Sequence, residues 1–234
     1  MEFSLLGAAA LGVGGLYAVL WFEAGRTNAA DCTRDLWDMA LGAAIVGLAT
    51  GRLWAMVAGG TNPITHPADI LIVRGGVDTA AASAAALATV AWLARKDLWG
   101  NLDALAPAAT GALAMWHAGC LVRDGCLGSV SSLPWAVAQD GSSVTRHPVE
   151  VYTAILLLVA AIALYLIKKT WPGRGVVAAA ALALAAAARL GTEPMRLSIG
   201  STPAPVYMVG VVLGVALVAW RRSVTRRRTP TGGT

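Results

Sequence analysis

The chain has 234 residues, of which 57% are hydrophobic and only 13% are charged, and its formal net charge is +5. Soluble domains carry roughly 25% charged residues, so the composition excludes an ordinary soluble protein and predicts an integral membrane protein. The positive charge is concentrated at the C-terminus, and nothing in the sequence resembles a nucleic-acid-binding module. No cysteine or histidine spacing is typical of a zinc site, and we expect no metal, no cofactor and no nucleic-acid partner.

Seven stretches are long and apolar enough to cross a bilayer, which requires about 20 mostly apolar residues in a helix. They cover residues 4–22, 37–58, 77–94, 104–122, 150–167, 174–190 and 204–220. The first stretch lacks a basic region before it and a small-residue cleavage site after it, so we interpret it as a span and not as a signal peptide. We therefore predict an all-α membrane protein, with a seven-span domain over residues 1–220 and a basic tail over residues 221–234.

The basic residues predict the orientation, because cytoplasmic connections carry an excess of lysine and arginine. With the N-terminus outside and the C-terminus in the cytoplasm, every lysine and the arginine-rich tail lie on the cytoplasmic side. Any single remaining arginine can extend toward the outer head groups, but six together suggest a pocket for an anionic lipid head group, because guanidinium groups match phosphate oxygens. These six are Arg52, Arg74, Arg123, Arg146, Arg189 and Arg196.

Acidic residues near these arginines are candidates to pair with them: Asp69, Asp78, Asp124, Asp140, Glu150 and Glu193. Glu193 is the best placed, because it lies four residues after Arg189 and three residues before Arg196. Pro194 should end or kink the helix. A shared helix face is therefore expected only for Arg189 and Glu193.

The most polar interruption between two apolar runs covers residues 115–152. It contains two of the three histidines, His117 and His147, together with two of the three cysteines and several turn residues. Polar side chains in or beside membrane spans are expensive to keep and usually have a function. Cys120 and Cys126 either form a disulfide on the oxidising side of the membrane or remain buried thiols.

Several of these stretches occur in an order and at spacings that match a known family. They are Gly51-Arg52, Arg74-Gly75-Gly76, Asp103 with Pro107, His117 and Gly119-Cys120 with Gly128, Leu133-Pro134-Trp135, His147-Pro148 with Tyr152, and Arg189 with Glu193 and Arg196. On these residues, over about positions 38–196, the sequence resembles the bacterial prolipoprotein diacylglyceryl transferase family. A lone His-Pro-x3-Tyr would be a weak motif, whereas the ordered set is specific.

The resemblance implies transfer of the diacylglyceryl group of phosphatidylglycerol to the thiol of a lipobox cysteine, with glycerol phosphate as the leaving group. Its partners would be phosphatidylglycerol, the signal peptide of a prolipoprotein and the bacterial cytoplasmic membrane, with the active site toward the outer leaflet. Arg189 and Arg196 are the expected phosphate ligands, held by Glu193. The substrate-binding positions that the resemblance implies are Arg52, Gly75, Gly76, Gly119, Cys120, Gly128, His147, Tyr152 and Arg196.

Two positions that have essential roles in the family differ reciprocally in this sequence. Arg74 stands at the histidine of a His-Gly-Gly element, and His117 stands at the arginine of the next signature. We hypothesise that they have exchanged roles, so that His117 is the catalytic base and Arg74 binds phosphate, because imidazole accepts a proton near neutral pH. Ala185 replaces a family tyrosine, Thr153 replaces a family acid, and the first span lacks the counterpart of another tyrosine.

Other interpretations remain open from the sequence. The first is a divergent paralogue with the same fold that binds phospholipid as an accessory membrane protein or uses another acceptor. The second is an anion transporter whose arginines line a path, although no second copy of the 117–128 signature indicates the repeats that are common in transporters. For His117 alone, the alternative to a base is a structural histidine at a helix end near the membrane interface.

Overall fold

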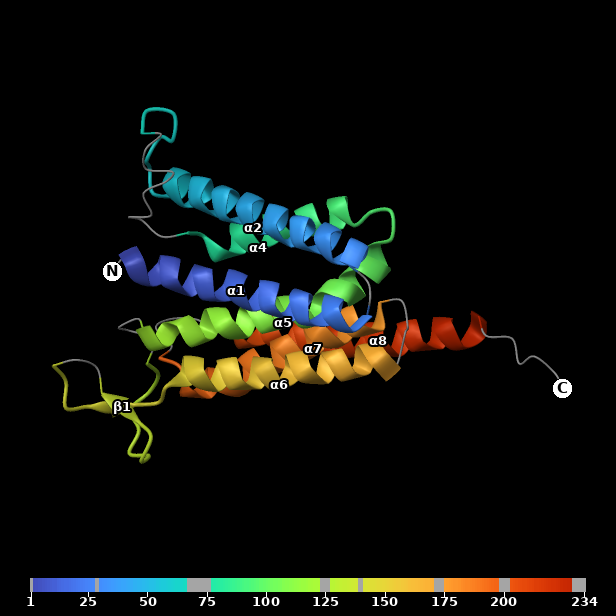
Figure 1. Ribbon diagram of the computed structural model, residues 1–234. Helices are drawn as coiled ribbons and strands as arrows, with labels where there is room; N and C mark the ends of the chain where they lie inside the picture. Colours follow the sequence, from blue (N-terminus) through green and yellow to red (C-terminus); the bar gives the residue numbers. More distant parts are fainter. Residues whose placement is uncertain are drawn as a thin grey trace. The chain divides into compact units, whose positions relative to one another are not determined.

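The computed structural model describes residues 2–27, 30–66, 77–122, 127–138, 141–170, 175–197 and 203–228 (Figure 1). These residues contain seven α-helices, which correspond one to one to the seven predicted spans. Four of them have segments long and apolar enough to cross a membrane, namely Leu36–Ala58, Val149–Thr170, Val176–Met195 and Ala204–Val224. Two shorter apolar segments are Gly7–Glu23 and Ala80–Leu93. The prediction of an all-α membrane protein is confirmed.

The helices and the short elements between them have the following bounds. The helices are α1 (Glu2–Thr27), α2 (Ala30–Ala58), α4 (Thr79–Leu93), α5 (Leu98–Ala118), α6 (Val149–Thr170), α7 (Val176–Thr192) and α8 (Ala204–Arg228). Two 3-10 turns, η1 (Gly119–Val122) and η2 (Glu193–Met195), follow α5 and α7. The strands β1 (Val137–Ala138) and β2 (Thr145–Arg146) form an antiparallel hairpin before α6 (Figure 1).

Two predicted boundaries differ from the structure. Helix α5 begins at Leu98, six residues before the expected span, and Pro107 therefore lies in the interior of the helix. Proline is disfavoured in a helix interior because it lacks a backbone N–H. Pro107 nevertheless occupies such a position, and its side chain is fully buried. Helix α8 continues to Arg228, so the first residues of the predicted tail are helical.

The chain forms two compact units, of which the first contains Phe3–Phe22 and Leu102–Thr234 and the second contains Glu23–Asn101. In the second unit α2 packs closely on α4 through glycine. A Cβ on Gly51 would lie 2.7 Å from the carbonyl oxygen of Asp78 and from the Cβ of Ala82. The Asp78 carboxylate in turn accepts a 2.7 Å hydrogen bond from the backbone N–H of Ala81 and caps α4.

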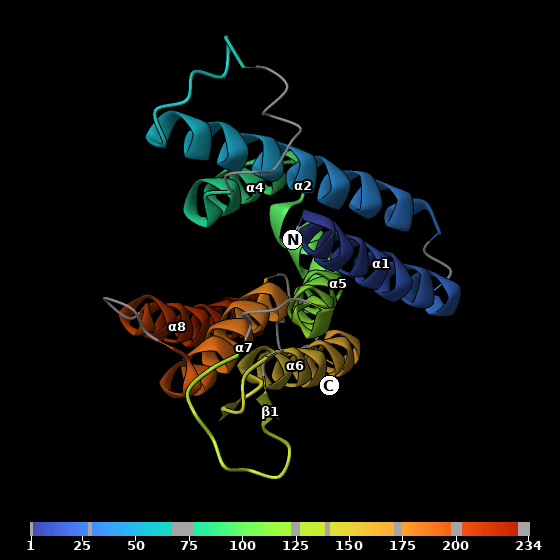
Figure 2. The same ribbon diagram turned by 90° about the vertical axis from the view of Figure 1, so that its left-hand side faces the viewer.

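The core of the first unit is formed by α5, α6 and α7, which lie side by side in Figure 2. Leu157 and Leu164 of α6 are completely buried and are the largest side chains of two core clusters. Their partners are small: Ala106 and Ala114 from α5, and Val177 and Ala188 from α7. The alanine-rich sequence therefore allows these helices to approach closely around two leucines.

A buried carboxylate joins the beginning of α5 to the beginning of α7. The oxygens of Asp103 accept hydrogen bonds from the backbone N–H groups of Gly175, at 2.6 Å, and Ala178, at 2.8 Å. The first N–H groups of a helix lack partners within it, and a carboxylate there also interacts favourably with the helix dipole. Lys168, near the end of α6, donates a 3.1 Å hydrogen bond to the carbonyl oxygen of Ala104. The start of α5, the end of α6 and the start of α7 therefore meet.

Helix α8 packs on α7 through two glycines that are four residues apart. A Cβ on Gly214 would lie 2.6 Å from the backbone nitrogen of Ala183, and one on Gly210 would lie 2.9 Å from the Cβ of Ala186. Backbones that approach this closely are typical of helix pairs in membranes.

We expect Gly214→Ala to lower the free energy of unfolding by about 1–3 kcal/mol, because the added methyl group meets the backbone of α7. Gly191→Ala is the matched control, since nothing lies within 4 Å of a Cβ at this exposed helical position. Alanine is favoured over glycine in a helix by up to about 1 kcal/mol, so the control should be neutral or stabilising. Thermal unfolding in detergent measures both, and equal midpoints for the two variants would contradict the packing argument.

Candidate functional site

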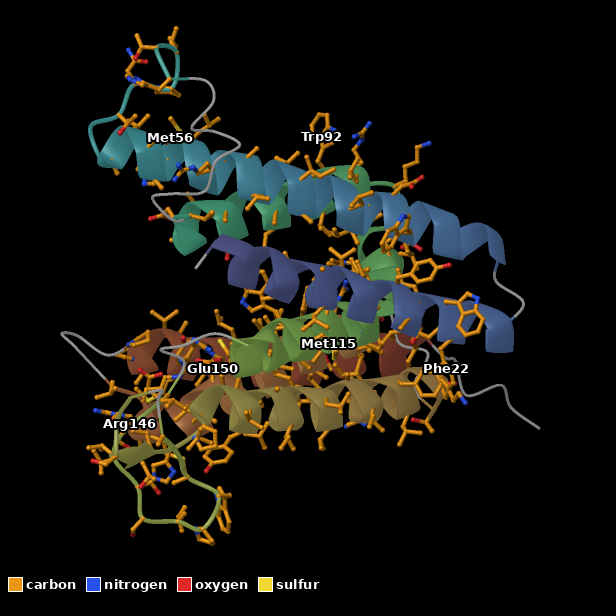
Figure 3. The ribbon with its side chains drawn as sticks, turned by 60° about the vertical axis from the view of Figure 1, so that its left-hand side comes forward. Phe22, Met56, Trp92, Met115, Arg146 and Glu150 are labelled. Carbon is orange, nitrogen blue, oxygen red and sulfur yellow. The ribbon has the colours of Figure 1, made fainter. Side chains whose placement is uncertain are left out.

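The polar cluster of the first unit lies where α5 ends and α6 begins. His117 is in the last turn of α5 and Glu150 is in the first turn of α6, and both are buried or nearly so. Figure 3 shows Glu150 at the end of α6 that is next to the hairpin carrying Arg146. Because the start of α5 meets the end of α6, the end of α5 meets the start of α6 at the opposite end of the unit.

Glu150 is the centre of this cluster. Its Oε2 contacts the Nδ1 of His117 directly, and its Oε1 lies 2.6 Å from Nη1 of Arg196. Nη1 of Arg189 lies 3.9 Å from Oε2. The Glu150 side chain is only 14% exposed, so its charge is balanced mainly by the two arginines. One carboxylate therefore connects the predicted base to both predicted phosphate ligands.

The expected pairing of Glu193 with Arg196 is confirmed, but Glu150 and not Glu193 is the best-placed partner of the two arginines. Helix α7 ends at Thr192, and Glu193 keeps a helical backbone conformation but begins the 3-10 turn that contains Pro194. Among the described residues, the ion pair of Arg189 is with Glu150 and not with Glu193. Glu193 lies 3.7 Å from Nε of Arg196. Within the described part of the chain, Oε2 of Glu193 and Nε of Arg196 are buried without a hydrogen-bond partner. The attraction between these two atoms is therefore electrostatic, without a hydrogen bond between them.

Arg189 has a partner that sequence patterns did not predict. Its Nε and Nη2 donate hydrogen bonds of 3.3 and 3.0 Å to the hydroxyl oxygen of Tyr207, and its guanidinium carbon lies 5.4 Å from the centre of the Tyr207 ring. Tyr207 is on α8, 18 residues away from Arg189 and outside every motif. The phenol nevertheless orients Arg189, the more exposed of the two arginines.

Two buried threonines complete the surroundings of Arg196. The hydroxyl of Thr153 is completely buried and lies 3.0 Å from the hydroxyl of Thr192. Nη2 of Arg196 donates a 3.4 Å hydrogen bond to the Thr153 oxygen. Thr153 follows Glu150 by three residues and therefore lies on the same face of α6. The threonine that replaces a family acid is thus part of the cluster.

The predicted substrate-binding residues His147 and Tyr152 form a second group. The Tyr152 hydroxyl accepts a 2.8 Å hydrogen bond from Nε1 of Trp135 and lies 3.5 Å from Nδ1 of His147, whose ring meets the Tyr152 ring edge-on. Two residues along a helix correspond to about 200°, so Tyr152 and Glu150 project to different sides of α6. None of the contacts described for His147 and Tyr152 involves the cluster around Glu150.

Glycines shape the backbone around the cluster. Gly128 donates a 2.8 Å hydrogen bond to the carbonyl oxygen of His147, and Ser129 donates one of the same length to Met195. A Cβ on Gly128 would overlap the Met195 carbonyl oxygen and the Val149 side chain. The loop, the start of α6 and the end of η2 meet at Gly128 because it has no side chain.

The other predicted positions either have structural contacts in the first unit, lie in the second unit or lie outside the described residues. A Cβ on Gly119 would lie 2.7 Å from the Cα of Ala8, so Gly119 allows close packing. Arg146 donates a 3.2 Å hydrogen bond to the Gly128 carbonyl oxygen. Cys120 is disulfide-bonded, and Arg52 is buried in α2 of the second unit. Outside the described residues lie Arg74, Gly75, Gly76, Arg123 and Cys126.

The cluster combines two chemical capacities. An imidazole held by a carboxylate can accept a proton, and two guanidinium groups can stabilise a phosphate that gains charge. The residues come from α5, α6 and the α7–η2 junction of one unit, and α8 adds Tyr207. Such an arrangement suits chemistry on a phosphate-bearing lipid.

Comparison with known proteins agrees with this description. The family model described as prolipoprotein diacylglyceryl transferase matches residues 2–224, which include every residue of the cluster. No curated protein matches the chain. The family match covers almost the whole sequence, and the chain therefore belongs to the prolipoprotein diacylglyceryl transferase family.

Proposed function

We propose that the protein transfers the diacylglyceryl group of phosphatidylglycerol to the thiol of a lipobox cysteine in a prolipoprotein. Family membership supports the reaction class. The observation that carries the proposal is that His117 contacts Glu150, whose carboxylate also contacts Arg196 and lies near Arg189. A base and two phosphate ligands are thus close together, although His117 replaces the arginine expected in the family signature.

In the proposed reaction His117 takes the proton from the lipobox thiol, because the thiolate is the reactive nucleophile. The thiolate then attacks the carbon of the diacylated glycerol that carries the phosphate ester. The new carbon–sulfur bond forms as the carbon–oxygen bond breaks, and the electron pair of that bond leaves with glycerol phosphate. Arg189 and Arg196 stabilise the leaving phosphate, and the proton on His117 passes to it. Burial of the cluster keeps competing water away.

The distribution of basic residues supports an outer-leaflet location for this site. Lys168 and Lys169 lie in the last turn of α6, whereas Glu150 lies in the first turn. A helix of this length extends about 30 Å, which is about the thickness of the hydrocarbon core. Lysines favour the cytoplasmic side, so the cluster belongs at the outer side, where the disulfide at Cys120 is also expected to persist.

The experiment that tests the proposal combines the purified full-length chain, labelled phosphatidylglycerol and a lipobox peptide in lipid nanodiscs. We expect a diacylglyceryl-modified peptide and release of glycerol phosphate, with no product from a peptide whose lipobox cysteine is serine. Binding of phosphatidylglycerol without transfer would contradict the proposal and favour a lipid-binding accessory protein. Absence of both binding and transfer would exclude both functions.

A further inference from the structure

We propose that Glu150 is the positioning residue of the catalytic base: its carboxylate fixes the imidazole of His117 in the tautomer that leaves Nε2 free to accept a proton. The inference rests on the proposed function and adds a residue to it that no motif had marked. Its basis is the direct contact between Nδ1 of His117 and Oε2 of Glu150.

The tautomer follows from the donors and acceptors in the cluster. Arg196 lies 2.6 Å from the other oxygen of Glu150 and favours its ionised form. An ionised carboxylate can only accept hydrogen bonds, so Nδ1 of His117 must carry the proton and donate it. In a neutral imidazole the second nitrogen, Nε2, then has its lone pair available.

The carboxylate is itself held in place. Arg196 binds Oε1 of Glu150, approaches Glu193 to 3.7 Å and donates to Thr153 at 3.4 Å. Thr153 in turn contacts Thr192. Rotation of the Glu150 side chain would break its contacts with His117 and Arg196 together, so the orientation of the imidazole is determined by a connected network.

The same carboxylate couples the two halves of the proposed reaction. Oε2 contacts the group that takes the thiol proton, and Oε1 contacts a group that stabilises the phosphate. When His117 becomes positively charged, the ionised Glu150 stabilises it, as an acidic residue does for the histidine of a serine-protease triad. The alternative is that Glu150 only anchors α5 to α6, and that role would not depend on the chemistry of His117.

Glu150→Gln separates the two roles. The substitution keeps the size of the side chain and a carbonyl oxygen for Arg196, but its amide NH2 can donate to Nδ1 of His117, which moves the ring proton to Nε2 and blocks the base. We expect kcat to fall by at least about 100-fold, with a smaller change in KM for phosphatidylglycerol, since the comparable change in a serine protease costs about 10⁴-fold. Activities are compared per amount of monodisperse protein.

A double-mutant cycle tests whether Glu150 acts through His117. In the His117→Ala background, Glu150→Gln should change the residual rate by less than about 3-fold. If the two losses multiply, Glu150 does not act through His117 and the inference is overturned. Wild-type activity in Glu150→Gln also overturns it and leaves the proposed function standing, whereas absence of transfer by the wild-type protein overturns the proposed function itself.

A spectroscopic measurement is independent of transfer. The chain has three histidines, so ¹⁵N-histidine labelling gives few signals, and His117→Ala identifies that of His117. We expect a proton on Nδ1 in the wild-type protein and on Nε2 in Glu150→Gln. Asp97→Asn is the control, because Asp97 lies in the second unit, where it accepts a hydrogen bond from the backbone N–H of Gly100, and it should leave the His117 tautomer unchanged. The same tautomer in wild type and Glu150→Gln would overturn the positioning role.

Discussion

Alanine at position 117 should lower kcat for diacylglyceryl transfer about 10²- to 10⁴-fold, the range that general acid–base catalysis contributes. The imidazole is the group in the described cluster that can take the thiol proton, because the Glu150 carboxylate is already engaged by Arg196 and His117 and the guanidinium groups remain charged. The loss should appear mainly in kcat, since the arginines that bind phosphate remain. Transfer of labelled lipid to a lipobox peptide at saturating phosphatidylglycerol measures it.

His66→Ala is the matched control for this prediction. His66 is an exposed histidine in the second unit, where its backbone N–H donates to Asn62 and its Nδ1 lies 2.9 Å from the Thr65 hydroxyl. Its removal should leave kcat unchanged. Full activity in His117→Ala would contradict the role of His117 as base and also the hypothesis that His117 and Arg74 have exchanged roles.

The architecture was predictable because membrane spans leave a strong signal in single sequences. All seven spans correspond to helices, and Pro194 correctly indicated the end of α7. The start of α5 was missed because residues 98–103 are too polar to be counted in an apolar stretch. That polarity is used locally: Asp103 caps α7 from within α5.

The cluster was predicted only in part, for a physical reason. His117, Arg189 and Arg196 stand within recognisable spacings, but the residue that joins them was passed over in favour of Glu193. Spacing reports neighbours along one helix, whereas the contact between His117 and Glu150 connects residues 33 positions apart on two helices. One indication was available: Glu150 lies in a predicted span, where an acidic side chain is by default a functional candidate.

Tyr207 and the threonines were missed for the same reason. Tyr207 reaches Arg189 only because α8 packs against α7 through Gly210 and Gly214. The sequence motif around Arg189 includes no residue of α8, so it could not indicate this contact. Conversely, Gly119 and Gly128 were predicted as substrate-binding residues on the basis of the motif. The structure gives them a packing role, since neither position leaves room for a side chain. A family motif marks the positions that matter without stating what each one contacts.

Removal of the Arg196 side chain should have the second largest effect. In Arg196→Ala, Glu150 loses its 2.6 Å partner and Glu193 loses its 3.7 Å partner, and their side chains are only 14% and 7% exposed. A broken buried ion pair costs about 3–5 kcal/mol, because the remaining charge is uncompensated. We expect a loss of this size in the free energy of unfolding, together with weaker binding of phosphatidylglycerol and loss of transfer. Thermal unfolding and lipid binding measure the two effects separately.

Two comparisons separate the charge from its geometry. Arg95→Ala removes an exposed arginine that stacks over Trp92 in the second unit, and it should change stability by less than about 0.5 kcal/mol. Arg196→Lys keeps the positive charge but not the planar fork that reaches Glu150, Glu193 and Thr153. It should therefore recover part of the stability but little of the transfer rate. Equal stability of Arg196→Ala and Arg95→Ala would show that Glu150 and Glu193 do not need Arg196 to compensate their charges. That result would also contradict the connected network that we propose orients His117.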